Sequence, residues 1–173
     1  LIKKKLSVLI ATMVEFGTCK IENVKLVYVS NRDKNQANLL SKRLKNKKQL
    51  YVMPLGVDKN DKGVKLKPSK EFILIFSGAL SYLPNLDAVK YLAEEIIPMV
   101  GNLKCTFRIV GKDGDKIFGH LANELIEVIG WTDQYSDYHR TASAFVCPLR
   151  MGSGSKNKVL QALSFGLPVL GSE

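Results

Sequence analysis

The sequence predicts an α/β fold over residues 71–173, a Rossmann-like doubly wound parallel sheet. Three observations support this prediction. Apolar strand-like runs alternate with helix-like segments in the order β-α-β-α-β-α-β-α-β. The loops between them are short, which favours right-handed crossovers between parallel strands. The first run, EFILIF, is continuously apolar, as is typical of a strand buried on both faces of a sheet. In such a sheet the ligand crevice lies beyond the carboxyl ends of the strands.

The first 57 residues contain a shorter alternation of elements. The β-rich run VKLVYV over 24–29 predicts a strand. Ser30 followed by Asp33 is typical of a helix start, and the helix is expected to continue to about Lys45. Apolar residues at helical spacing give it one buried face: Ala37, Leu40 and Leu44. QLYVMPLGVD begins with a second strand, and residues 58–70 lack periodicity and indicate a linker.

After the strand EFILIF and the turn SGALSYLPN, a helix is expected to start at Pro84 and Asn85. Its apolar residues fall on one stripe: Leu86, Val89, Ala93, Ile96, Ile97 and Val100. The later elements follow from the same pattern: strand 105–110, loop 111–115, helix 116–125, strand 126–130, helix 134–142, strand 144–149, helix 156–165 and strand 167–172.

The composition is that of a folded protein, with 173 residues of which 46% are hydrophobic and 24% charged. No apolar stretch approaches the roughly 20 residues needed to cross a bilayer. A short apolar run follows the first lysines, but Glu15 and Lys20 stand where a signal peptide would have its cleavage site. Cys19, Cys105 and Cys147 are odd in number and widely spaced, which indicates neither a disulfide framework nor a zinc site. These features favour the cytoplasm.

The net charge of +10 is concentrated in one part of the chain. Residues 1–70 contain 17 Lys and Arg against 5 Asp and Glu, whereas residues 71–173 contain 9 against 11. Such a basic segment could attract an anionic lipid surface or a polyanion, or could be a solvated lysine-rich surface. Aromatic residues do not alternate with its lysines as they would in a groove for single-stranded nucleic acid.

Glycine-bearing loops follow three of the predicted strands, where the ligand crevice is expected. They contain Gly78, Gly111 and the segment 152–155, which reads GSGS. The last loop is the most informative, because Arg150, Lys156 and Lys158 surround it just before a helix. Backbone N–H groups, the helix dipole and cations would then converge where a diphosphate could bind. The alternative interpretation is a strand-to-helix turn with surface cations.

The segment PLRMGSGSKNKVLQALSFGLPVLGS resembles the donor-site segment of retaining GT-B glycosyltransferases of group 1, similar to family 4. FSGALSYLPNLDAVKYL resembles the first loop and helix of the same domain. FRIVGKDGD and VIGWTDQYSDYHRTASAFVCPL resemble its next strand and loop elements. VSNRDKNQANLL and VMPLGVD resemble the end of the family's N-terminal domain and the interdomain connector. The resemblance covers nearly the whole chain and is strongest from about residue 71.

This resemblance implies three parts of an incomplete two-domain GT-B fold. Residues 1–57 would be the tail of the acceptor-side Rossmann-like domain with its connector, 58–70 a linker, and 71–173 the donor-binding domain without its C-terminal end. A chain of this extent is expected to be inactive alone, since the acceptor side is missing.

The resemblance also implies a function. The family transfers a sugar from a nucleotide-diphosphate-sugar donor to an acceptor hydroxyl with retention of anomeric configuration, in polysaccharide or glycoconjugate biosynthesis. It needs no cofactor and no obligatory metal. The expected partners are the nucleotide sugar and a carbohydrate or lipid-linked acceptor, and no nucleic acid. The expected location is the cytoplasm. The basic charge of residues 1–70 adds the expectation of peripheral association at the inner membrane.

The resemblance assigns the donor-binding positions. Gly78, Arg150, Lys158 and the amides near Ser155 would stabilise the leaving diphosphate. The family commonly has two glutamates in this segment. Ser153 stands at the position of the first, so the catalytic residue is unknown. Gln161 stands at the position of the second, near the ribose. The Trp131 segment should lie near the base, although a packing role for its indole is the alternative. The complete donor-binding set is Gly78, Gly111, Trp131, Thr132, Arg150, Gly152, Gly154, Ser155, Lys158 and Gln161.

Two other functions remain open at this stage. A non-hydrolysing nucleotide-sugar epimerase shares the two-domain architecture, but the PLRMGSGSKNKVLQAL segment resembles the transferases more closely. A basic nucleic-acid-binding module is suggested only by the charge of residues 1–70. His120 and His139 are expected on crossover helices without a nucleophile beside them, so they are not candidates for catalysis.

Overall fold

The computed structural model describes residues 17, 25–43, 49–57, 71–100, 104–151 and 156–172, with backbone alone for 40–43 and 49. The chain divides into two compact units, Leu1–Leu55 and Gly56–Glu173. The predicted linker 58–70 and the residues Leu44 and Lys45 lie outside the described ranges. In the described ranges no helix is long and apolar enough to cross a membrane.

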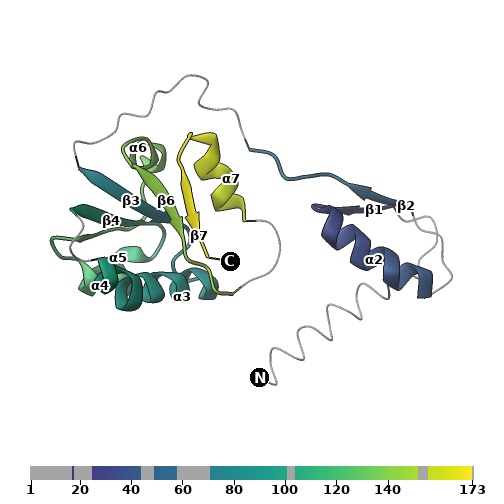
Figure 1. The fold of residues 1–173 in the computed structure, drawn as a ribbon, viewed down its shortest axis with the longest axis horizontal. Coiled ribbons are helices and arrows are strands. Elements are labelled where there is room, and N and C mark those ends of the chain that lie inside the picture. The colour runs from purple at the N-terminus through teal and green to yellow at the C-terminus, as the bar shows by residue number, and fades with distance from the viewer. Residues whose placement is uncertain are drawn as a thin grey trace. The chain divides into compact units, whose positions relative to one another are not determined.

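The first unit is a βαβ element, shown at the purple end of the chain in Figure 1. Strands β1 (Lys25–Tyr28) and β2 (Gln49–Val52) pair in parallel, and α2 (Asn31–Arg43) connects them. The expected helix start is confirmed, because the amide of Asp33 donates to Oγ of Ser30 at 3.1 Å and the Ser30 hydroxyl donates to the Asp33 carboxylate at 2.7 Å. These bonds satisfy an amide that the first helical turn would otherwise leave unpaired.

The second unit contains a five-stranded sheet with the order β5-β4-β3-β6-β7, and every neighbouring pair is parallel. The strands are β3 (Phe72–Ser77), β4 (Cys105–Val110), β5 (Ile126–Ile129), β6 (Ala144–Cys147) and β7 (Val169–Gly171). The predicted doubly wound parallel sheet is therefore confirmed. Strand β3 lies at its centre, and five of its six residues are buried.

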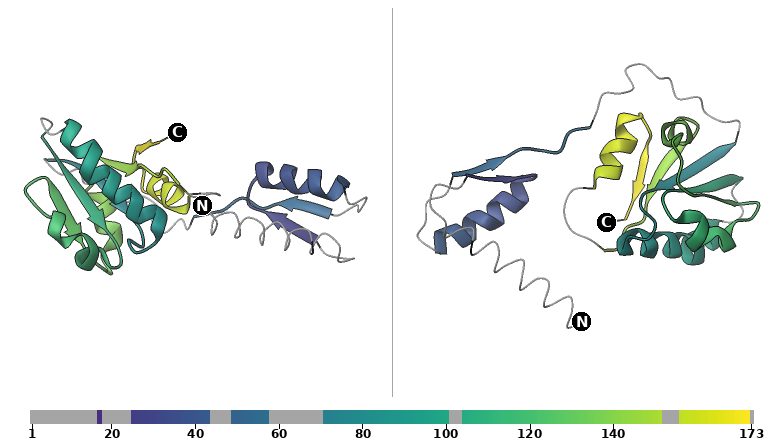
Figure 2. Two further views of the ribbon diagram at one scale, coloured as in Figure 1. Left: turned by 90° about the horizontal axis from the view of Figure 1, so that it is seen from below. Right: turned by 180° about the vertical axis from the view of Figure 1, so that it is seen from behind.

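Helices cover both faces of this sheet (Figure 1 and Figure 2). On one face lie α3 (Leu83–Tyr91), α4 (Ile97–Val100) and α5 (Gly114–Phe118); on the other lie α6 (Tyr135–Arg140) and α7 (Asn157–Ser164). Alternate residues of β3 point to the two faces. Leu74 and Phe76 belong to the core beneath α3, whereas Ile73 and Ile75 belong to the core beneath α7. The chain changes direction between β3 and β6, and a ligand crevice is expected at such a point.

The helix after β3 differs from the prediction in one respect. Its apolar stripe packs on the sheet as expected, but Leu92–Ile96 form a π turn between α3 and α4, in which the amide of Ile97 donates to the carbonyl of Leu92. Pro98 follows two residues after this turn. A proline ring clashes with the carbonyl four residues earlier, and the wider π turn relieves that clash.

The predicted helix 116–125 is wrong in its second half. Helix α5 ends at Phe118, one turn of 3₁₀ helix covers Gly119–Leu121, and the rest is a turn. Oδ1 of Asn123 accepts hydrogen bonds from the amides of Leu125 at 2.8 Å and Ile126 at 3.0 Å. This side chain competes with helical hydrogen bonding and directs the backbone into β5.

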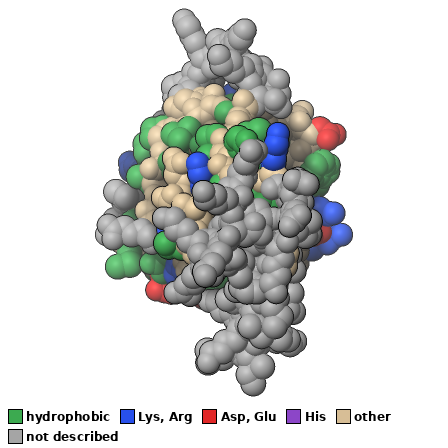
Figure 3. Space-filling view, turned by 90° about the vertical axis from the view of Figure 1, so that its right-hand side faces the viewer, with side chains coloured by type: hydrophobic (Ala, Val, Ile, Leu, Met, Phe, Trp, Pro, Cys, Tyr) green, Lys and Arg blue, Asp and Glu red, His purple; other side chains and the backbone are tan. Residues whose placement is uncertain are grey.

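Several large apolar side chains remain exposed. In the first unit they include Val27, Tyr51 and Met53, with 56%, 46% and 68% exposure. Figure 3 shows hydrophobic side chains at the surface beside Lys and Arg side chains. A two-stranded sheet has too little core to bury both of its faces.

Candidate nucleotide-binding site at the strand ends

Three glycines follow three neighbouring strands at the same level of the sheet. Ser77 pairs in register with Val110, and Val110 with Ile129, so the next residues, Gly78, Gly111 and Gly130, stand side by side. The amide of Gly78 donates to the carbonyl of Val110, and that of Gly111 to the carbonyl of Ile129, both at 3.0 Å. The register therefore brings two of the three predicted glycine loops, those of Gly78 and Gly111, to one edge together with Gly130.

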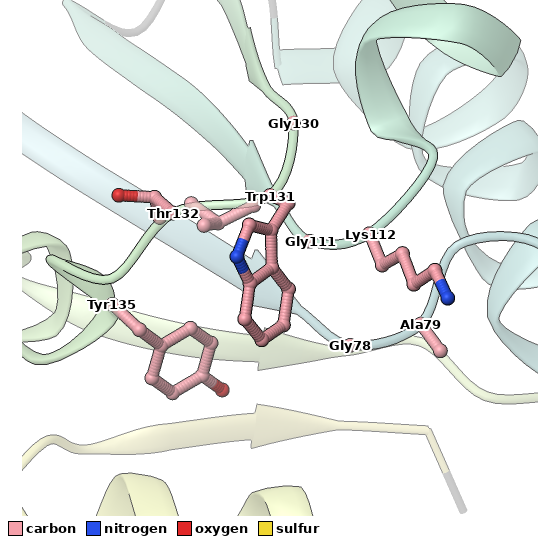
Figure 4. Close-up of a pocket in the computed structure, with 9 residues that line it drawn as sticks. Gly78, Ala79, Gly111, Lys112, Gly130, Trp131, Thr132 and Tyr135 are labelled. Carbon is pink, nitrogen blue, oxygen red and sulfur yellow. The ribbon is translucent and has the colours of Figure 1, made fainter.

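A pocket of about 260 Å³ opens beside these loops (Figure 4). In Figure 4 the indole of Trp131 extends over Gly78 and Gly111, with its nitrogen on the side of Tyr135, while Lys112 points away from the ring. Trp131 is 75% exposed, so it fills no core position and offers a bare aromatic face. The lining residues are Gly78, Ala79, Val110, Gly111, Lys112, Gly130, Trp131, Thr132 and Tyr135.

Gly78 and Gly111 are needed for the shape of this edge. Their φ values are 153° and 152°, a region that residues with a side chain rarely adopt. A β-carbon at Gly78 would lie 2.8 Å from Nδ2 of Asn85 and 3.0 Å from Nζ of Lys158. The missing side chain thus makes room for an amide and an ammonium group directly beside the pocket.

Lys158 extends from α7 towards the end of β3. Its ammonium group donates to Oδ1 of Asn85 and lies 4.5 Å from the centre of the Phe76 ring. Asn85 is buried, and its own amide donates to the carbonyl of Ala79 at 2.7 Å. Burial lowers the pKa of Lys158 to about 8, with a further lowering by Lys156, while Cys147 acts in the opposite direction. The ammonium is therefore poorly solvated and placed to gain from a nearby anion.

The start of α7 contributes a second source of positive potential. The helix begins at Asn157, directly after Lys156, and the amides of its first turn carry partial positive charge. Gly152, Ser153, Gly154 and Ser155 lie outside the described residues, so their predicted roles in binding stay predictions. The described part of the site consists of Lys158, the pocket and the residues that link them.

A buried polar chain connects the pocket wall with α7. Ser77 Oγ lies 2.6 Å from the Tyr135 hydroxyl and 3.1 Å from Nε2 of His139. Nδ1 of His139 lies 2.9 Å from the carbonyl oxygen of Tyr135, and the Tyr135 hydroxyl lies 3.3 Å from Oε1 of Gln161. Burial raises the pKa of Tyr135 and lowers that of His139. Both side chains are therefore neutral at pH 7.

Arg150 is occupied by acidic residues of the helix after β3. Its guanidinium donates to both carboxylate oxygens of Asp87, at 2.9 and 3.2 Å, and to Glu95 at 3.3 Å. It also lies 4.2 Å from the centre of the Tyr91 ring. These contacts hold Arg150 on α3, so in this structure Lys158, rather than Arg150, is the cation beside Gly78.

The structure thus brings together Gly78, Gly111, Trp131 and Thr132 in one pocket, with Lys158 next to Gly78 and Gln161 behind Tyr135. Sequence reasoning missed several of the neighbours that complete the site: Ser77, Asn85, Lys112, Tyr135 and His139. Asn85 could have been found from the sequence, because it follows Pro84 in the segment that resembles the first loop of the family's donor domain. No local signal marked Ser77 or His139, because they meet only when β3 and α6 pack together.

Among the described residues no cluster of three or more His, Cys, Asp and Glu side chains is placed to hold a metal ion. The expectation that no metal is required remains untested.

Comparison with known proteins gives a consistent result. The family model described as "Glycosyl transferases group 1" matches residues 71–173. No curated protein sequence matches the chain.

Three similar solved structures cover most of the chain. They are the GtfA/B complex (18% identity, TM-score 0.59, 92% of this chain and 32% of that one), TarM (13%, 0.66, 93% and 31%) and the pneumococcal O-GlcNAc transferase GtfA in complex with UDP and GlcNAc (19%, 0.56, 84% and 29%). At these identities the likeness shows a shared fold. The chain spans about a third of the length of these proteins.

Proposed function

This chain belongs to the glycosyl transferases of group 1, and we propose that its strand-end pocket binds a nucleotide-diphosphate sugar. The longer protein would transfer that sugar to an acceptor hydroxyl with retention of configuration. The observation that carries the proposal is the position of Lys158, a poorly solvated ammonium group beside Gly78 at the rim of an aromatic-walled pocket.

The diphosphate is assigned to Lys158 and the start of α7. Gly78 leaves its backbone open to close approach, and the ammonium group lies on the α7 side of it. When the sugar is transferred, negative charge develops on the leaving diphosphate. A fixed cation in a poorly solvated position stabilises that charge more than it would in water. Arg150 would provide a second cation once released from Asp87 and Glu95.

The nucleoside is assigned to the pocket. A volume of about 260 Å³ suits a nucleoside better than a whole nucleotide sugar, so the phosphates and the sugar would extend beyond it. Trp131 offers an exposed ring for stacking on the base, with Thr132 and Gly130 at its side. The pneumococcal structure with UDP has the same fold, which supports UDP as the first nucleotide to test.

The ribose is assigned to the side of the pocket where Tyr135 meets Gln161. A glutamine forms weaker hydrogen bonds to hydroxyls than the glutamate that the family commonly has there, so donor affinity would be lower. Gly111, Gly152, Gly154 and Ser155 complete the proposed donor site, and Ser153 occupies the position of the other glutamate.

The sequence resemblance supports the remaining parts of the proposal: retention of configuration, no obligatory metal, a carbohydrate or lipid-linked acceptor, and a place in polysaccharide or glycoconjugate biosynthesis. Residues 1–70 contain 17 basic and 5 acidic residues. This excess of positive charge supports a cytoplasmic protein bound peripherally at the inner membrane. No nucleic acid is part of the proposed function.

The proposal is tested by NMR titration of the chain with UDP and GDP. Shift changes should concentrate on the glycine loops, Trp131, Thr132 and the start of α7. Because one wall of an interdomain cleft is expected here, affinity should be on the order of millimolar. Lys158→Ala should weaken binding, and Lys116→Ala on α5 serves as the control. Shift changes confined to the other residues, or equal behaviour of both variants, would show that the site is assigned wrongly.

A further inference from the structure

The buried chain from His139 through Ser77 and Tyr135 ends at the side-chain amide of Gln161, and we propose that it holds this amide with its carbonyl oxygen facing the ligand. Ser77, Tyr135 and His139 would then be positioning residues that set the polarity of the ribose contact. This inference rests on the proposed function, because it assigns the ligand group that Gln161 meets.

His139 fixes the direction of the chain. Nδ1 lies 2.9 Å from the carbonyl oxygen of Tyr135, and since a carbonyl can only accept, Nδ1 carries a proton. The side chain is completely buried, which lowers its pKa below the ordinary value of 6.5. Its neighbours from β3, α6, β6 and the end of α7 are Ser77, Tyr135, Phe145 and Phe165, of which only Tyr135 can titrate. At pH 7 Nε2 therefore carries no proton and must accept.

The next two hydrogen bonds follow from proton counting. Ser77 Oγ lies 3.1 Å from Nε2 of His139, so the serine hydroxyl donates to the imidazole. A serine has one hydroxyl proton, and it is now used. The contact of 2.6 Å between Ser77 and Tyr135 needs a proton as well, so the phenol donates to the serine oxygen.

The last step concerns Gln161. In the structure Oε1 of Gln161 lies 3.3 Å from the Tyr135 hydroxyl. With its proton donated to Ser77, the Tyr135 oxygen offers only lone pairs, so two acceptors would face each other in this orientation of the amide. The two ends of an amide have nearly the same size, so the hydrogen bonds decide which end faces Tyr135. We therefore assign the amide in the opposite orientation, with the NH₂ group facing Tyr135 and Oε1 facing away from it. In this orientation Oε1 can accept from a ribose hydroxyl.

This arrangement has a chemical consequence for the ligand. A carboxylate at position 161 could only accept hydrogen bonds, and a freely turning glutamine could either accept or donate. The buried chain restricts Gln161 to accepting. The ligand group that it recognises must therefore be a donor, such as a ribose hydroxyl, and replacement of that hydroxyl by fluorine should weaken binding.

The test compares UDP with its 2′-fluoro and 3′-fluoro analogues, whose fluorine cannot donate. The unaltered chain should bind one analogue roughly 2- to 10-fold more weakly than UDP. Tyr135→Phe removes the oxygen that holds the NH₂ group, and Ser77→Ala frees the phenol proton to donate to Gln161. Both variants should bring the ratio of the two dissociation constants close to 1. Tyr138→Phe, on the same helix but outside the chain, should keep the ratio.

A merely structural role for these residues would weaken UDP and both analogues alike, and that result would overturn the inference. A second measurement needs no ligand. In long-range ¹H–¹⁵N spectra of the free chain at pH 7, His139 should carry its proton on Nδ1 alone, and a proton on Nε2 would equally overturn the inference. Failure of the unaltered chain to bind UDP or GDP at all would instead count against the proposed function.

Discussion

A β-carbon on Gly111 would overlap the carbonyl oxygen of Gly78, so these two residues lie against each other through backbone atoms. Both residues have φ values in the positive region. The close approach aligns the two strand ends that form the floor of the pocket. Shape at this edge therefore depends on the absence of a side chain at Gly111.

Gly111→Ala should lower the free energy of unfolding by about 2–4 kcal/mol, because an alanine would be strained at this φ and would push the two loops apart. Urea unfolding can be followed by the fluorescence of Trp131, the only tryptophan in the sequence, which reports on the second unit. The matched control is Gly119→Ala, where a β-carbon meets open space and φ is −54°. This control should raise the free energy of unfolding by about 1 kcal/mol at most. Equal effects of the two changes would contradict this account.

UDP binding should depend on pH through Lys158. Its pKa is lowered to about 8 by burial, and only the ammonium form attracts a diphosphate. Affinity should be constant between about pH 7 and 8, where the phosphate charge of UDP is already complete, and fall by up to about tenfold per pH unit above pH 8. Binding of the anion raises the pKa of Lys158 in the complex, so the fall begins near the pKa of the free chain and ends near the higher pKa of the complex.

Lys158→Arg provides the control for this pH dependence, because a guanidinium stays charged throughout the range. Its affinity for UDP should be nearly flat between pH 7 and 9.5. Calorimetric titration over this range gives the profile. A sloping profile in the arginine variant would assign the titration to another group.

Trp131→Ala should weaken UDP binding by about 1–3 kcal/mol, the range for loss of stacking on a base. The same change should leave the affinity for ribose 5-diphosphate, which has no base, unaffected. In the unaltered chain UDP should quench the Trp131 fluorescence. If Trp131→Ala weakened both ligands equally, the indole would contribute packing instead of stacking.

Arg150→Ala should weaken UDP binding less than Lys158→Ala does. The Arg150 guanidinium is held by two oxygens of Asp87 and one of Glu95, and these carboxylates already neutralise its charge. The pair with Asp87 is partly exposed and screened by solvent, so its loss should change the stability of the fold little. Parallel titrations of both variants decide. A larger loss for Arg150 would mean that the arginine leaves α3 when the nucleotide binds.

The order of the elements could be predicted because it depends on local pattern. The apolar run of β3 and the helical stripe from Leu86 to Val100 each indicate one buried environment, and both were confirmed. The errors concern single residues that change the backbone hydrogen bonding locally, which the pattern of apolar residues does not show. Asn123 stops a helix through its side chain, and Pro98 coincides with a π turn inside a helix whose apolar stripe is continuous.

The candidate site was predictable only in part. The floor of the pocket could be predicted from the glycines that follow parallel strands, since the register of the strands places these glycines side by side. The chain from His139 to Gln161 could not be predicted, because Ser77 and Tyr135 are 58 positions apart in the sequence. The partner of Arg150 was missed for the same reason. Contacts of this kind depend on how α3 and α6 pack on the sheet, which residue spacing does not determine.

The strand order also determines when each edge of β3 can pair while the chain is being synthesised on the ribosome. Strand β3 receives β4 as its neighbour first, and its other edge stays unpaired until β6 has been made, as the contact of Ile73 with Ser143, 70 residues later, illustrates. At about 5–20 residues per second this open edge persists for a few seconds. A nascent chain stalled after Ile129 has emerged should therefore bind chaperones more readily than one stalled after Gly171.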